Sequence, residues 1–191
     1  MCGRYLIEDE AYADMLELLN DPKAAQSMAH GEVFPSNIAP VIMRDGASVV
    51  KWGFPHWKSA GVIINARAET ALAKNMFSKP LLTRRCVVPS SGFYEWDRTG
   101  GKKKDKYLLQ RPGERLLYMA GMVGIFRDSS GCEYSAFVIL TTAANDSVAP
   151  IHDRMPVILT PQEREQWLID DEFMRHALCR PGPELSKMLL P

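Results

Sequence analysis

Apolar side chains recur every three or four positions near the start of the chain. Ile7, Ala11, Met15 and Leu18 fall on one face of a helix with 3.6 residues per turn, which predicts an amphipathic helix. Close to the other end, Thr160-Pro161-Gln162-Glu163 has the form of a capping box with proline at the first helical position. Helices are predicted over residues 8–19, 69–77, 161–168 and 173–178.

The rest of the chain favours short strands. Asp45-Gly46 lies between two apolar runs, 41–43 and 49–52, and predicts a hairpin. Short strands at close spacing with helices at the periphery predict an α+β fold, with a curved or barrel-like antiparallel β-sheet core and peripheral short helices. A chain of 191 residues suits one domain, 1–191. Further strands are predicted over residues 62–64, 85–88, 93–96, 107–109, 116–126 and 134–141.

Charge and composition exclude several classes of protein. Lysine plus arginine equals aspartate plus glutamate, 23 each, so the formal net charge is zero. We therefore do not expect a protein that coats duplex DNA through its overall charge, whereas a local basic groove stays open. The N-terminus lacks the basic and apolar regions of a secretory signal, and no apolar run reaches the roughly 18 residues of a membrane span. We expect a cytoplasmic protein with no membrane partner.

The cysteines and histidines are scattered along the chain. None of the four cysteines forms a CxxC pair, and the four histidines show no HxxxH spacing. We therefore expect no metal site, and no disulfide framework in a reduced, intracellular chain. No cofactor is implied.

Cys2 stands where removal of the initiator methionine would leave a free α-amine beside a thiol. The two groups have ordinary pKa values near ~8 and ~8.5, so both are usable nucleophiles at neutral pH. The amine can form a Schiff base with an aldehyde, and the thiol can then close a five-membered thiazolidine. The alternative is a small apolar residue at the start of a strand.

Three further residues are candidates for acid–base or positioning chemistry. Glu95 lies among aromatic residues in the run 92–96. Desolvation there would raise the pKa of its carboxyl and suit it to proton transfer. The alternative is an exposed glutamate on a half-solvated strand. His152 lies in a proline-bracketed loop and is an acid or base, or a surface histidine. Asn65, directly after an apolar strand, can orient a reactant or simply make a turn.

A basic track with stacking side chains is a further possibility. The track would consist of Arg4, Arg84, Arg85, Arg154 and the lysine run 102–104, and Trp52 or Trp57 could offer a face to a base. Arg67, directly after an apolar strand, could also bind a phosphate. The alternatives are core positions for the tryptophans and a solvated hairpin tip for the lysine run 102–104.

Together these segments resemble the SRAP (SOS response-associated peptidase) family in its bacterial or phage-type branch. The resemblance covers residue 2 to about residue 167 and implies the SRAP fold. It rests on seven segments in family order: Met1-Cys2-Gly3-Arg4-Tyr5, Asn37-Ile38-Ala39-Pro40, Trp52-Gly53-Phe54, Asn65-Ala66-Arg67-Ala68-Glu69-Thr70, Arg85-Cys86-Val87-Val88-Pro89, Gly92-Phe93-Tyr94-Glu95-Trp96 and Ile151-His152-Asp153-Arg154-Met155-Pro156.

The resemblance implies a protein that senses abasic sites in single-stranded DNA. After Met1 is removed, it would form a covalent thiazolidine cross-link through Cys2. The cross-link would shield the lesion during the DNA damage response. AP-lyase activity would be a minor reaction. Cys2 would be the nucleophile, Asn65 would orient the amine or the sugar, Glu95 would shuttle protons, and His152 would act on the sugar hydroxyl. The expected DNA contacts are Arg4, Arg67, Arg154, Arg85, Trp52 and Asn37. We expect a monomer, associated with the nucleoid when bound to damaged DNA.

One departure and two alternatives accompany this interpretation. The tail 179–191 lacks the His-Pro-Val-Ser-like strand and the asparagine of family members, which predicts a truncated sheet edge or missing DNA contacts. Cys2 with His152 and either Asn65 or Glu95 could instead form a thiol peptidase or amidohydrolase site. A non-catalytic module for single-stranded or modified DNA is the third possibility.

Overall fold

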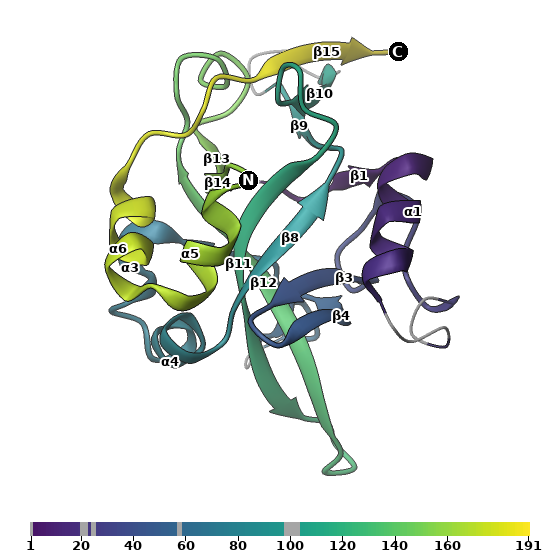
Figure 1. Cartoon of the computed structure of the whole chain (residues 1–191), viewed down its shortest axis with the longest axis vertical. Helices are drawn as coiled ribbons and strands as arrows, with labels where there is room; N and C mark the ends of the chain where they lie inside the picture. Colours follow the sequence, from purple (N-terminus) through teal and green to yellow (C-terminus); the bar gives the residue numbers. More distant parts are fainter. Residues whose placement is uncertain (1, 20–22, 24–25, 57–58, 98–103) are drawn as a thin grey trace.

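A closed barrel of five strands forms the centre of the molecule (Figure 1). The computed structural model describes residues 2–19, 23, 26–56, 59–97 and 104–191. The pairing runs β12–β4–β3–β8–β11 and returns to β12; all pairs are antiparallel except β12–β4. The barrel strands are β3 (Ile38–Met43), β4 (Gly46–Trp52), β8 (Arg85–Ser90), β11 (Leu117–Arg127) and β12 (Glu133–Ala143).

A second antiparallel sheet lies beside the barrel and carries the N-terminal strand at its centre. Its order is β15–β10–β9–β1–β2, so β1 is hydrogen-bonded on both sides. Its strands are β1 (Tyr5–Ile7), β2 (Gly31–Val33), β9 (Gly92–Trp96), β10 (Lys106–Gln110) and β15 (Ser186–Leu190). Burial of the alternate side chains of β1 places the start of the chain against the main core.

Short helices flank the barrel, as predicted for the α+β class. In Figure 1, α1 lies on one side and α3–α6 gather on the other. Their bounds are α1 (Asp9–Leu18), α3 (Ala68–Ala71), α4 (Asn75–Thr83), α5 (Glu163–Ile169) and α6 (Asp171–Cys179). The short strands β5 (Phe54–Pro55) and β6 (Val62–Ile63) pair with each other, β7 (Asn65–Arg67) and β13 (Arg154–Pro156) pair with β12, and β14 (Ile158–Leu159) pairs with β11.

Most predicted elements are confirmed, and the helix over 69–77 is the main exception. The chain forms α3, turns, and starts α4, which continues to Thr83 although Pro80 removes one helical hydrogen bond. Phe77 and Leu81, four positions apart, are buried against the barrel, and this contact holds α4 beyond the proline. The predicted lysine hairpin tip falls largely on residues 98–103, outside the described residues.

The C-terminal tail does not leave a sheet edge truncated, contrary to one of the two expectations for it. Its last strand, β15, pairs with β10 along the full length of both strands. The Asn145 amide donates to the carbonyls of Gly182 and Pro183, and the Leu185 N–H donates to Ser147 Oγ. Sequence patterning missed β15 because its side chains are mostly exposed and show no alternation.

The capping box at α5 is linked to a partly buried ion pair that makes stability depend on pH. The Thr160 N–H donates to Glu163 Oε2 over 2.8 Å, and Arg180 donates to both oxygens of the same carboxylate. Hydrogen bonding from Arg180 lowers the pKa of Glu163 from its ordinary 4.5 to about 2. Because the folded pKa is depressed, the stabilisation is complete above pH 4.5 and is lost as pH falls towards 2.

Glu163→Gln is therefore expected to lower the free energy of unfolding at pH 7 by about 1–2 kcal/mol. Denaturant titrations of both proteins between pH 2 and pH 7 measure the difference. It should shrink as the wild-type carboxylate becomes protonated, and a difference that stays constant across that range would contradict the assigned pKa.

Candidate functional site

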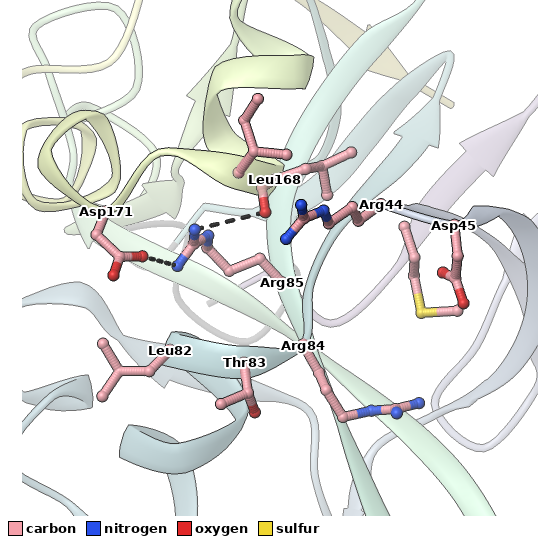
Figure 2. A pocket seen from close by; sticks show the side chains of 10 residues that line it. Arg44, Asp45, Leu82, Thr83, Arg84, Arg85, Leu168 and Asp171 are labelled. Carbon is pink, nitrogen blue, oxygen red and sulfur yellow. Dashed lines mark hydrogen bonds and ion pairs between the residues drawn. The ribbon is translucent and has the colours of Figure 1, made fainter.

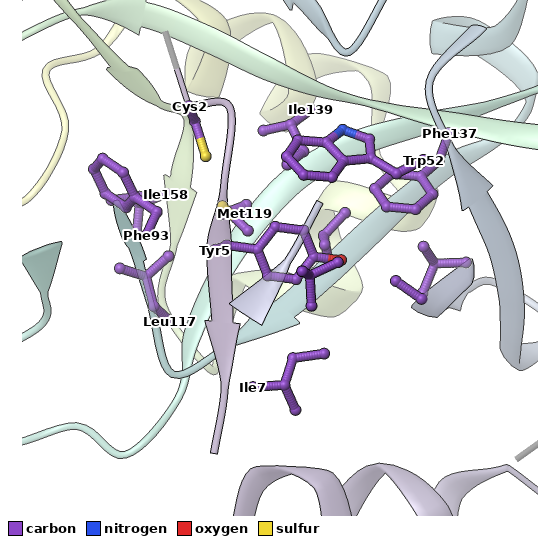
Figure 3. Packing of buried hydrophobic residues seen from close by; sticks show 14 of the residues in the cluster. Cys2, Tyr5, Ile7, Trp52, Phe93, Leu117, Met119, Phe137, Ile139 and Ile158 are labelled. Carbon is purple, nitrogen blue, oxygen red and sulfur yellow. The ribbon is translucent and has the colours of Figure 1, made fainter. Parts of the chain in front are cut away.

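Cys2 lies just before β1 with its side chain fully buried in the main core cluster (Figure 3). Its thiol donates to the carbonyl of Arg4 with a sulfur–oxygen distance of 3.8 Å. Burial, and next the nearby charge of Glu95, raise the pKa of the Cys2 thiol well above its usual range. The thiol is therefore neutral at physiological pH.

Glu95 and His152 meet at the same place from two separate segments. Glu95 is on β9, beside β1, and His152 is in the loop before β13. Glu95 Oε2 and His152 Nε2 are 4.0 Å apart, and the two side chains are 5% and 6% exposed. The predicted desolvation of Glu95 is thus present: strand alternation places it inside, on the side of Phe93, which is also buried.

The hydrogen bonding of His152 assigns its ring proton. The backbone N–H of Arg154 donates to His152 Nδ1 over 2.9 Å, so the neutral ring carries its proton on Nε2, facing Glu95. The Asp153 carboxylate is also 3.0 Å from Nδ1, but a backbone N–H can only donate, and this fixes Nδ1 as an acceptor. Acid–base chemistry at His152 must therefore use Nε2.

Asn65 links the start of the chain to the barrel. Its Nδ2 donates to the carbonyl of Cys2 over 2.8 Å, and its Oδ1 is buried with no hydrogen-bond partner in the described part of the chain. Trp52 fixes the preceding residue, because its indole N–H donates to the Ile64 carbonyl over 3.1 Å. Asn65 bonds to the Cys2 backbone, and Glu95, which faces His152, is near enough for its charge to raise the pKa of the Cys2 thiol. The structure thus brings all four predicted catalytic candidates together around Cys2.

The prediction that Trp52 stacks against DNA bases is wrong. Its side chain is fully buried, with its ring stacked on Phe137 and tilted against Tyr5 (Figure 3). A base cannot reach either face of this ring, so Trp52 acts on the site by holding the strand that carries Asn65.

The predicted arginines differ in how available their charges are. Arg67 is exposed at the end of β7. Arg4 is 34% exposed, and its guanidinium donates to Glu32 over 3.0 Å. Arg154 donates two hydrogen bonds, of 2.6 and 2.9 Å, to the Glu69 carboxylate, and these lower the pKa of that carboxyl. Arg154 also donates to the Thr141 carbonyl.

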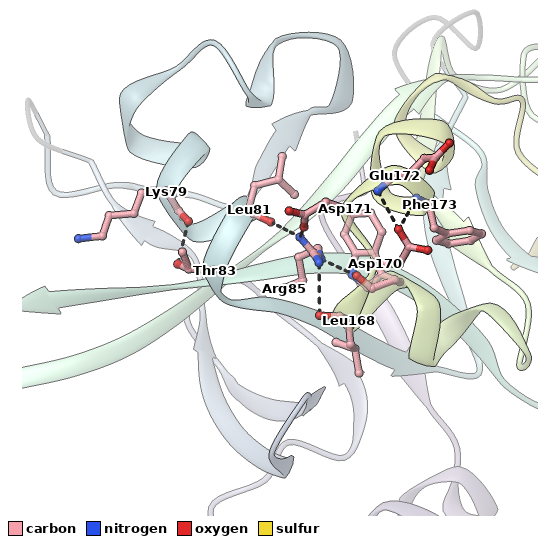
Figure 4. A network of polar contacts seen from close by, with 10 residues as sticks. Lys79, Leu81, Thr83, Arg85, Leu168, Asp170, Asp171, Glu172 and Phe173 are labelled. Atoms are coloured by element: carbon pink, nitrogen blue, oxygen red, sulfur yellow. Dashed lines mark hydrogen bonds and ion pairs between the residues drawn. The ribbon is translucent and has the colours of Figure 1, made fainter.

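Arg85 does not lie with the others. Its guanidinium is buried and donates to three carbonyls, those of Trp167, Leu81 and Leu168, and to the carboxylate of Asp171 (Figure 4). These bonds join β8 to α4, α5 and α6, so Arg85 has a structural role and is not free to bind a phosphate.

Comparison with known proteins places the chain in a family. The model of the SOS response associated peptidase (SRAP) family matches residues 1–188. The chain belongs to the SRAP family. The abasic site processing protein YoqW of Bacillus subtilis is 36% identical over 183 residues, covering 88% of this chain and 80% of that protein. The abasic site processing protein YedK of Escherichia coli is 29% identical over 180 residues, with 88% and 79% covered.

The SRAP fold is also confirmed by a solved structure. A protein from Bacteroides thetaiotaomicron is 25% identical, with a TM-score of 0.86 over 100% of this chain and 92% of that chain. Among the residues described here, no group of three or more His, Cys, Asp or Glu side chains is placed to hold a metal ion. No helix in the described ranges is long and apolar enough to cross a membrane.

An aromatic and cationic surface beside Arg4 is the part of this SRAP site that sequence reasoning missed. The Arg4 guanidinium lies over the rings of Phe34 and Trp96, at 4.4 and 4.9 Å from their centroids. Phe34 is 42% exposed, at a turn held by its N–H, which donates to Asn37 Oδ1 over 2.9 Å. The alternation of strand 93–96 already set Trp96 opposite Glu95, but no local signal marks Phe34.

Proposed function

We propose that this protein captures an abasic site in single-stranded DNA covalently, through the α-amine and the thiol of Cys2 after Met1 is removed. The observation that carries the proposal is the group of Asn65, Glu95 and His152 around a cysteine at position 2. The names of the relatives YoqW and YedK, abasic site processing proteins, point to the same substrate.

The chemistry is a condensation followed by a ring closure. The amine nitrogen adds to the aldehyde carbon of the opened sugar, and loss of one water gives a Schiff base. The sulfur then adds to the imine carbon while the thiol proton moves to the imine nitrogen, which completes the thiazolidine. A Schiff base that stalls before ring closure can eliminate the 3′ phosphate, which would account for minor lyase activity.

The thiol's environment sets the order of these steps. A thiol whose pKa is raised by burial is a poor first nucleophile, so the amine attacks first. Glu95 is the base that takes the thiol proton during ring closure, and the Nε2–H of His152 supports that carboxylate or protonates the sugar oxygen. The unused Oδ1 of Asn65 suits a hydrogen bond from the amine or a sugar hydroxyl.

Single-stranded DNA would bind through Arg67 and Arg4, with bases against Phe34 and Trp96. Stacking on aromatic rings and a few phosphate contacts suffice for single strands, which agrees with zero net charge. Arg154 would join the phosphate contacts only by loosening its bonds to Glu69. The bound protein would shield the lesion.

The thiol peptidase alternative is less well supported. Such an enzyme needs a thiolate stabilised by a neighbouring cation. Here burial and the charge of Glu95 raise the pKa of Cys2 by more than the N-terminal charge lowers it. A non-catalytic DNA-binding module does not require a buried acid–base pair beside Cys2, so this alternative does not explain Glu95 and His152.

Denaturing electrophoresis tests the proposal. Protein lacking Met1 is mixed with a single-stranded oligonucleotide containing one abasic site, with the same oligonucleotide intact, and with the abasic strand in a complete duplex. We expect a band of protein plus DNA that survives denaturation with the first substrate and is far weaker with the other two. Equal yields from the single strand and the duplex would contradict the single-strand preference.

Phe34→Ala is expected to weaken binding of an intact single strand by about tenfold, because one stacked base is worth about 1–3 kcal/mol. Fluorescence anisotropy of a labelled oligonucleotide measures the change. The matched control is Leu189→Ala, an exposed apolar residue on β15 that is 57% exposed. Equal effects of the two substitutions would remove Phe34 from the proposed DNA-binding face.

A further inference from the structure

A second surface with the features of a binding site lies at the far end of β8 from the Cys2 site. Arg85 begins this strand and Ser90 ends it, and the next residue, Ser91, donates its N–H to the Leu6 carbonyl of β1. The two ends are separated by about 17 Å of strand, at ~3.3 Å per residue. A ligand at the Arg85 end would leave the Cys2 site open.

Two adjoining pockets form this surface. The larger, of about 610 Å³, lies between the β3–β4 turn, the end of α4 and the α5–α6 junction (Figure 2). The smaller, of about 340 Å³, lies between α4 and β11. Thr83 and Arg84 line both pockets, so the two adjoin each other, and we call them together the α4 groove.

Cationic side chains outnumber carboxylates among the described lining residues of the α4 groove. Arg44, Lys79 and Arg84 line it, and none of them makes an ion pair with any residue in the described ranges. Figure 2 shows Arg44 reaching towards the buried Arg85 across the larger pocket. The Asp171 carboxylate pairs with Arg85 at 2.8 Å. The guanidinium groups of Arg44 and Arg84 are therefore available to an incoming anion.

The same groove exposes an unusual share of apolar surface. Leu82, Ile125 and Ile169 are 42%, 51% and 51% exposed. They are three of the eight large apolar side chains that are exposed in the described part of the chain, and all three line the groove. Exposed apolar side chains gathered around unpaired cations are typical of a protein-binding surface.

The chemistry of the lining selects a peptide over a nucleic acid. The larger pocket has no aromatic side chain among its described lining residues, so it offers no platform for a base. Asp45 and Asp171 also line it, and a phosphate, which has only acceptor oxygens, would offer these carboxylates no hydrogen-bond donor. A peptide offers backbone N–H donors to these carboxylates and acidic side chains to the arginines.

We propose that the α4 groove is a docking site for an acidic segment of a partner protein that carries large aliphatic side chains. The acidic groups would pair with Arg44 and Arg84, and the aliphatic groups would cover Leu82, Ile125 and Ile169. This site is independent of the proposed DNA chemistry, and it would let the protein bind a partner while Cys2 is engaged.

Fluorescence anisotropy with a labelled short peptide of alternating glutamate and leucine tests the proposal. Two control peptides replace every glutamate with glutamine or every leucine with serine. We expect saturable binding of the first peptide only, weakening as salt is added. Arg84→Glu and Arg44→Glu should each weaken binding by about tenfold or more, and Ile169→Ser by about threefold. All three positions are exposed, so melting temperatures should stay unchanged.

The matched control is Arg127→Glu, an arginine on β11 that is 71% exposed and lies outside the groove. It should bind the peptide as the wild type does, and all variants should capture abasic DNA normally. Absence of saturable peptide binding, or equal weakening by the control, would overturn the proposal. Two further outcomes would also overturn it. If the wild type binds no peptide and Arg84→Glu loses binding of oligothymidine, the groove binds DNA. If the wild type is a dimer that Arg84→Glu dissociates, the groove binds a second copy of the chain.

Discussion

Cys2→Ala is expected to abolish the covalent adduct with abasic single-stranded DNA while leaving binding of intact single strands within about twofold of wild type. Alanine removes the sulfur that closes the ring but keeps the α-amine once Met1 is removed. The remaining Schiff base is reversible, so it should appear on a denaturing gel only after reduction with borohydride. Gel yields with and without borohydride measure the two species.

Cys132→Ser is the matched control for this change. Cys132 is exposed in the turn between β11 and β12, and its loss should leave adduct formation unchanged. A stable adduct formed by Cys2→Ala without borohydride would contradict ring closure by the thiol. Absence of any borohydride-trapped species, in protein confirmed to lack Met1, would contradict attack by the amine.

Glu95→Gln is expected to slow adduct formation by about 100-fold or more, the range for loss of a positioned general acid or base. The substitution keeps the size of the side chain but removes the base that takes the thiol proton during ring closure. Because the Glu95 charge raises the pKa of Cys2, its removal should lower that pKa. The thiol should therefore react faster with iodoacetamide even though capture of DNA becomes slower. Single-turnover kinetics and alkylation rates measure the two opposite effects.

A disturbed fold would also expose the buried Cys2 thiol and speed its alkylation. The opposite effects therefore report proton transfer only if the melting temperature and the affinity for intact DNA stay unchanged, and we expect both to do so. Asp97→Asn, two residues further along the same segment, is the matched control and should leave the rate of capture unchanged. A capture rate in Glu95→Gln within threefold of wild type would remove Glu95 from the chemistry.

The catalytic candidates could be predicted from sequence because each has a local signal. Cys2 is marked by its position, Glu95 by strand alternation among aromatic residues, and His152 by its loop between prolines. Their convergence could not be derived from those signals, since it depends on β1 lying between β2 and β9 and on the loop before β13 packing against them. The family resemblance supplied that link, and the geometry agrees with it.

The DNA contacts were harder to predict because charge and ring type do not reveal burial. Trp52 and Arg85 belong to family-like segments, yet one is fully buried on Phe137 and the other bonds to backbone carbonyls. Their surroundings are formed by strands and helices distant in sequence, which no local pattern reports. Phe34, in contrast, lies at a turn with no periodicity, and only the fold brings it beside Trp96 and Arg4.

The intact mass of the adduct tests the central claim most directly. Protein confirmed to lack Met1 is incubated with a single-stranded oligonucleotide bearing one abasic site, and the product is measured by mass spectrometry. We predict the mass of protein without Met1 plus DNA minus one water, with a Cys2 thiol that iodoacetamide no longer alkylates after the adduct is denatured. We predict no such product from protein that keeps Met1. An adduct that forms with Met1 retained, or one whose thiol is still free, would contradict capture by the aminothiol of Cys2.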